Sequence, residues 1–77
     1  MPRAWRVRGS VEWLRGKEVA ARASWDRSLR VAEDLGARYE VAMTHIEIGR
    51  RLCDREELQR GGDILAEVEG SFKHDPA

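Results

Sequence analysis

The chain has 77 residues, of which 36% are charged, and its formal net charge is zero. A chain of this length forms one domain at most and buries a small fraction of its surface. Its single cysteine, Cys53, excludes an internal disulfide, and its Cys and His residues lack the paired spacing of a structural zinc site. Helix packing or a partner must therefore supply the stability.

The sequence also bears on the compartment. No stretch approaches the roughly 18 apolar residues of a membrane span, and the charged start of the chain has no apolar run behind it. A free thiol agrees with a reducing compartment. We expect a cytoplasmic protein, and twelve arginines against two lysines indicate a bacterial, high-GC origin.

Charge is distributed unevenly along the chain. Residues 1–17 are basic and residues 53–77 are acidic, which favours stacking of unlike ends of two molecules. The alternative is two independently solvated faces. The charged residues of the first end are Arg3, Arg6, Arg8, Arg15, Lys17 and Glu12, and those of the second are Asp54, Glu56, Glu57, Asp63, Glu67, Glu69, Asp75, Arg55, Arg60 and Lys73.

Hydrophobic periodicity predicts two helices in the first half, at residues 2–15 and 18–34. The first is interrupted by Gly9-Ser10. The second has one packing face and one face of alternating charges at i,i+4 steps, and Gly36 ends it in the left-handed conformation. The residues at helical spacing in the first helix are Trp5, Gly9, Trp13 and Leu14. The packing face of the second is Ala21, Trp25, Ser28, Leu29 and Ala32, and its charge ladder is Glu18, Arg22, Asp26 and Arg30.

A third helix is predicted at residues 37–52. It carries two apolar stripes, which is the pattern of a helix with neighbours on both sides. Arginines in its last turn lie at the negative end of the helix dipole. The stripes are Tyr39, Ala42, Met43 and Ile46 on one side, and Val41, Ile48 and Leu52 on the other.

A fourth helix is predicted at residues 55–70. Asp54 is its expected N-cap, and Glu57 completes a capping box. Gly61 and Gly62 each cost about 1 kcal/mol relative to alanine, although small residues permit close helix contact. The residues after it, 73–77, contain Pro76 and are expected to fray.

These segments resemble the tetratricopeptide (TPR) repeat. Trp5, Gly9, Ala21, Trp25 and Ser28 fall at its motif spacings, while Arg8 and Glu12 depart from its Leu and Tyr. In the second half Tyr39 aligns with Trp5, Met43 replaces the glycine, and Gly61, Leu65 and Val68 match after an insertion around residues 53–57. The resemblance implies an all-α fold of two TPR-like helix-turn-helix hairpins in a short right-handed α-solenoid, a single domain at residues 2–72 with repeats at about 2–35 and 36–70.

A narrower resemblance lies in residues 25–36, 38–42 and 44–50. These stretches are similar to the C-terminal repeats of bacterial signalling ATPases linked to class III adenylate or guanylate cyclases, and the similarity covers roughly residues 5 to 70. The phosphate loop, the paired metal-binding aspartates of a cyclase and a Gly-x-Gly-x-x-Gly stretch are all missing. The chain is therefore a detached tail, a truncated product or a stand-alone adaptor.

No constellation of residues indicates catalysis, a metal or a cofactor. His45 and Cys53 are two turns apart, and His74 falls in the expected tail. Cys53 has no positioned base beside it, and Ser10, Glu12 and His45 form no recognisable triad. We expect a protein that is not an enzyme.

The TPR resemblance implies a concave face lined by the first helix of each hairpin. It nominates partner-binding residues for a peptide, a helix or a larger signalling protein, although chaperone-tail specificity is doubtful because the chain contains no asparagine. These residues are Arg3, Arg6, Ser10, Trp13, Glu40, Thr44 and Glu47.

Three functions stay open: a protein-interaction repeat, an oligomerising tail of a signalling ATPase, and a nucleic-acid-binding helical module. Repeats bury their apolar faces only against neighbours, and about three are normally needed. With two repeats, we expect exposed apolar surface at both ends and self-association. The residues concerned are Val7, Val11 and Trp13 at the first end, and Ile64, Leu65, Val68 and Phe72 at the last.

Overall fold

A computed structural model describes residues 1–73. In this range the chain is entirely helical, with α1 at Pro2–Leu14, α2 at Glu18–Asp34, α3 at Arg38–Leu52 and α4 at Arg55–Lys73, and it has no strand. The helix predictions are confirmed to within three residues at each end. The expected frayed tail overlaps the end of α4 at Lys73, and its other residues lie outside the described range.

The turns between the helices are short and follow local chemistry. Gly16 and Gly36 have φ angles of +77° and +66°, a region that glycine enters at little cost. Cys53 adopts the left-handed conformation at the C-cap of α3, with φ at 53°. The Asp54 Oδ1 then accepts hydrogen bonds from the backbone N–H groups of Glu56 and Glu57, so Asp54 is the predicted N-cap of α4.

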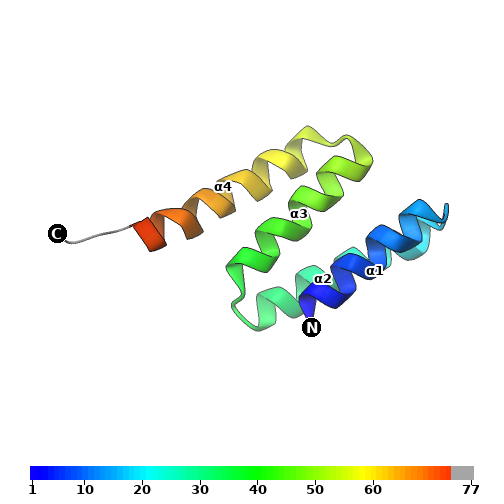
Figure 1. The fold of residues 1–77 in the computed structure, drawn as a ribbon, viewed down its shortest axis with the longest axis horizontal. Coiled ribbons are helices and arrows are strands. Elements are labelled where there is room, and N and C mark those ends of the chain that lie inside the picture. The colour runs from blue at the N-terminus through cyan, green and yellow to red at the C-terminus, as the bar shows by residue number, and fades with distance from the viewer. Residues whose placement is uncertain (74–77) are drawn as a thin grey trace.

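The helices form two hairpins in series, α1 with α2 and α3 with α4 (Figure 1). Helix α3 lies between α4 and the first hairpin and contacts all three other helices. Helix α4, by contrast, contacts only α3 among them. The two apolar stripes of α3 therefore correctly indicated a helix with neighbours on more than one side.

In the first hairpin a glycine lies under a tryptophan. A Cβ atom added to Gly9 would fall 2.5 Å from Cδ1 and from Nε1 of Trp25, so only glycine permits this approach of α1 to α2. Trp25 is 1% exposed, and its Nε1 donates a hydrogen bond to the carbonyl oxygen of Arg6. The Trp13 ring lies 5.9 Å from that of Trp25 between centroids. The predicted packing role of Trp25 is confirmed.

The second hairpin has two close contacts at glycines. At one, the glycine is in the first helix of the hairpin, as Gly9 is in α1, and at the other it is in the second helix. Gly49 of α3 lies against Leu58 of α4, but Gly61 of α4 lies against Ile46 of α3. The expectation that small residues in α4 permit close contact is confirmed for Gly61. A cluster of buried apolar residues joins the hairpins and consists of Ala32, Val41, Ala42 and Ile64. Leu29, Ala37 and Leu65 pack against this cluster.

Three sequence predictions need correction. Ile64 is buried in this cluster rather than exposed, because α4 turns it toward α3. Tyr39, placed on an apolar stripe, is 51% exposed in the first turn of α3, although Ala42 and Ile46 of the same stripe lie against Gly61 of α4. The capping box is incomplete, since the Glu57 carboxylate bonds to His45 Nδ1 at 2.5 Å. The side chain of Phe72, also expected to be exposed, lies outside the described residues.

Of the helices in residues 1–73, none has both the length and the apolar character that a membrane span requires.

Replacing Trp25 tests the packing of the first hairpin. We expect Trp25→Ala to lower the free energy of unfolding by about 3–5 kcal/mol, which approaches the whole stability of so small a domain. Thermal unfolding followed by circular dichroism, from a purely helical starting spectrum, measures this change. Val19→Ala, at an 85% exposed side chain, is the control. Unchanged unfolding of Trp25→Ala would contradict the packing.

Two neighbouring glycines of α4 should respond to alanine with opposite sign. A Cβ atom at Gly61 would lie 2.6 Å from Ile46 Cγ1 and 2.8 Å from the Ala42 carbonyl oxygen, so Gly61→Ala should destabilise the fold. Gly62 has open space around it, and Gly62→Ala should stabilise the helix by about 1 kcal/mol. Denaturant unfolding of both variants measures the difference. Shifts of the same sign would show that α4 does not approach α3 at Gly61.

Candidate interaction surfaces

The face formed by α1 and α3 is held by polar side chains. Arg6 Nη1 donates to Glu40 Oε2 at 2.6 Å, and the hydroxyl of Ser10 donates to the Glu47 carboxylate. Arg51 Nε donates to the same Glu47 oxygen at 3.0 Å. The bonds of Arg6 to Glu40 and of Ser10 to Glu47 join the first helices of the two hairpins, beside the apolar cluster that joins α2 to α3.

The structure gives the seven predicted partner-binding residues different environments. Two pairs, Arg6 with Glu40 and Ser10 with Glu47, bond across the hairpins. Trp13 is half-buried against Trp25, and Arg3 is exposed. Thr44 is fully buried. Its Oγ1 donates to the Glu40 carbonyl oxygen at 2.8 Å and lies 2.9 Å from the Ser28 hydroxyl.

Much of the predicted face is therefore engaged within the chain. Thr44 has no accessible surface to offer a partner, although its helical position alone could not show this. Arg6, Ser10, Glu40 and Glu47 are partly exposed and keep some surface. A partner on this face would meet charges that already have partners, which weakens each new ion pair.

The charge state of Glu47 reflects this network. Burial raises the pKa of its carboxyl, but hydrogen bonds from Ser10 and Arg51, and the charges of Arg51 and Arg50, outweigh burial. The pKa of Glu47 is consequently below its ordinary value of 4.5. The carboxylate is thus ionised where α1 meets α3.

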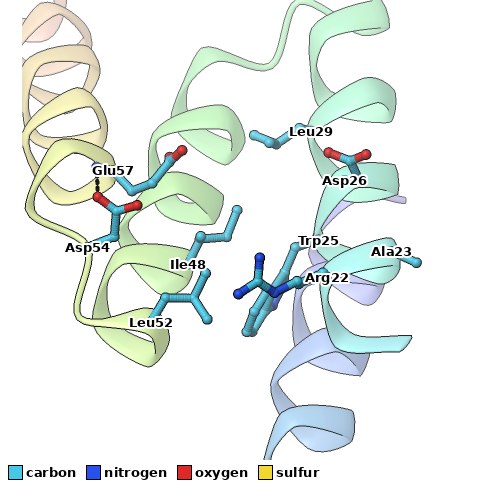
Figure 2. A pocket seen from close by; sticks show the side chains of 9 residues that line it. All are labelled: Arg22, Ala23, Trp25, Asp26, Leu29, Ile48, Leu52, Asp54 and Glu57. Atoms are coloured by element: carbon cyan, nitrogen blue, oxygen red, sulfur yellow. Dashed lines mark hydrogen bonds between the residues drawn. The ribbon is translucent and has the colours of Figure 1, made fainter. Parts of the chain in front are cut away.

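A groove opens on another side of the molecule, between α2 and the turn from α3 to α4. Its volume is about 390 Å³. Figure 2 shows Ile48 and Leu52 of α3 facing Trp25 and Arg22 of α2 across it, with Asp54 and Glu57 at the start of α4. Apolar side chains and carboxylates can together receive a basic side chain with an aliphatic stem.

The third surface is an apolar stripe on the outer side of α1. Val7 is 52% exposed and Leu14 is 70% exposed. Val11, which lies between them, and Ala4, which precedes them, are also exposed. We call Ala4, Val7, Val11 and Leu14 the α1 stripe. From the sequence we expected Val7 and Val11 to be exposed, whereas Leu14 was grouped with Trp5, Gly9 and Trp13 by helical spacing alone. The alternating three- and four-residue spacing was the signal that would have joined all four.

Trp5 and Cys53 supply no separate site. The guanidinium groups of Arg8 and Arg27 lie 5.3 Å and 5.0 Å from the centroid of the Trp5 ring. Cys53 is exposed at the end of α3. Within residues 1–73, no group of three or more His, Cys, Asp or Glu residues is placed to hold a metal ion.

Comparison with protein-family models, with curated proteins and with solved structures gave no match for this chain.

The lowered pKa of Glu47 gives a prediction about acid stability. A carboxyl whose pKa is lower in the folded than in the unfolded chain stabilises the fold above its unfolded pKa and loses this contribution as the pH falls through the folded pKa. We therefore expect Glu47→Gln to be less stable than wild type at pH 7, and the difference to shrink toward about pH 3, as the pH falls from the ordinary glutamate pKa toward the lowered pKa of Glu47.

Thermal unfolding at both pH values measures this difference. Glu56→Gln is the matched control, because Glu56 is exposed and contributes only backbone to the cap of α4. Equal destabilisation by Glu47→Gln at pH 7 and pH 3 would contradict an electrostatic role for Glu47.

Proposed function

We propose that this protein is a non-catalytic protein–protein interaction module. The observation that carries the proposal is the α1 stripe, a row of exposed aliphatic side chains along one helix. A row of this kind, bordered by charged residues, is typical of a surface that a partner covers. Arg3, Arg8 and Arg15 border it and are exposed, so the partner that fits best is an amphipathic helix carrying acidic residues beside its apolar side.

We also propose that the two hairpins are TPR-like repeats of a short right-handed α-solenoid. Support comes from the serial hairpins, from the position of α3 between α4 and the first hairpin, and from the contact of Gly9 with Trp25 at two motif positions. The second hairpin supports the proposal less well. There Met43 replaces the motif glycine, and the close contacts form at Gly49 and Gly61 instead.

Two further functions follow in order of support. An oligomerising tail of an adenylate-cyclase-type signalling ATPase is favoured by the resemblance of residues 25–50 and by exposed apolar residues at both ends of the fold. A nucleic-acid-binding role has weaker support, although Arg3, Arg8 and Arg15 are exposed. Stacking on a base needs a free ring face, and Arg8 and Arg27 already lie over Trp5.

Site-specific crosslinking tests the proposed function. A photoreactive p-benzoylphenylalanine replaces Val11 in the α1 stripe or, as the control, Val19, which is exposed outside the stripe. In extract of the source cell we expect a discrete protein adduct from position 11 and none from position 19. Adding Leu14→Glu to the position 11 variant should abolish the adduct, since it places a charge in the stripe. Identical adducts from both positions, or none from position 11, would contradict the proposal.

A further inference from the structure

The first and third helices occupy comparable places in their hairpins but have different numbers of neighbours. Helix α3 is covered by α4 on one side and by α1 and α2 on others. Helix α1 contacts only α2 and α3, and the α1 stripe lies on its remaining side. The uncovered side of α1 is therefore the apolar one.

The position of the α1 stripe matches a side of α3 that is covered. Counted back from the start of the following helix, Thr44 occupies in α3 the place of Val7 in α1, and Arg51 occupies the place of Leu14. Thr44 lies beside Ser28 of the preceding hairpin, and Arg51 bonds to Glu47, which accepts from Ser10 of α1. The corresponding side of α3 meets the preceding hairpin, so the α1 stripe has the place of a surface that receives another hairpin.

The α3–α4 hairpin exposes a complementary surface at the other end of the fold. Gly49 lies against Leu58 and Ile46 against Gly61, and this antiparallel register places Leu65 level with Ala42, the residue next to Met43. Met43 and Leu65 are partly exposed, and Tyr39, one turn before Met43, is more than half exposed. We call Tyr39, Met43 and Leu65 the C-terminal patch.

Charge distinguishes the two surfaces and indicates which partner suits them. The α1 stripe is bordered by Arg3, Arg8 and Arg15. Within the described part of the chain, only Arg8 of these three has a nearby carboxylate, that of Glu12, at the long distance of 3.8 Å. Among residues 55–70, α4 exposes four carboxylates against two arginines and is therefore acidic on balance: Glu56, Asp63, Glu67 and Glu69 against Arg55 and Arg60. The chain as a whole is neutral. A second copy thus offers apolar side chains together with the acidic helix that a basic stripe attracts.

We propose that the α1 stripe of one copy docks on the C-terminal patch of a second copy, with the stripe's arginines against the acidic α4. This inference rests on the proposed function and identifies the partner helix as one from the same protein. The two surfaces differ, so the contact is heterologous and leaves a free surface at each end of every complex. Association therefore continues beyond the dimer as concentration rises.

Sedimentation velocity on the full chain tests the docking. Wild type should shift from monomer to larger species between about 1 and 100 μM at low salt, and less so at 1 M salt, where the Debye length falls to about 3 Å. Leu14→Glu and Tyr39→Glu should each remain monomeric, because each places a charge in one surface at an exposed position. Leu65→Asp should weaken association similarly. Val19→Glu, the matched control, should associate as wild type does.

Mixing the two monomeric variants identifies the surfaces. Leu14→Glu retains the C-terminal patch and Tyr39→Glu retains the α1 stripe, so together they should form a 1:1 dimer that does not grow. A mixture that stays monomeric, or Tyr39→Glu that associates alone through two α1 stripes, would overturn the proposed pairing. Wild type that is monomeric at every concentration would overturn docking between copies, while the position 11 adduct with another protein would still support the proposed function.

Discussion

The close approach of α1 to α2 at Gly9 determines how the rest of the chain is arranged. The Trp25 ring occupies the space where any other residue at position 9 would place its Cβ atom, and its indole nitrogen bonds to the α1 backbone. With α1 held this near, Arg6 and Ser10 reach Glu40 and Glu47 on α3. The contact between a glycine and a tryptophan in one hairpin thus sets the polar contacts between the two.

The same contact explains why α1 is apolar on its outside. The inner side of the helix uses Pro2, Gly9 and Ser10, which are small or pair with polar groups, so the aliphatic side chains remain for the outer side. The first hairpin consequently relies on one buried tryptophan, whereas the second shares an apolar cluster with α2. This imbalance leaves aliphatic side chains of α1 in water, and covering them with a partner would be favourable.

The polar face and the α1 stripe therefore have different roles. Side chains such as Arg6 and Glu40 satisfy each other and orient the hairpins, and a partner gains little by competing with them. Aliphatic side chains in water have no competing partner, so covering them is favourable by about 25 cal/mol per Å². For this reason we propose the stripe as the binding surface, rather than the face that the repeat resemblance nominated.

Local sequence determined the helices and their ends: glycines at the turns, Asp54 as an N-cap and a packing periodicity centred on Trp25. These features depend on neighbours along the chain, and sequence displays them directly. Only the tertiary structure decided that Thr44 is buried, that Glu57 bonds to His45 instead of closing a capping box, and that Leu14 faces outward. Helical periodicity shows which residues share a side of a helix. Which helix meets that side, and how closely, depends on contacts between residues far apart in the sequence.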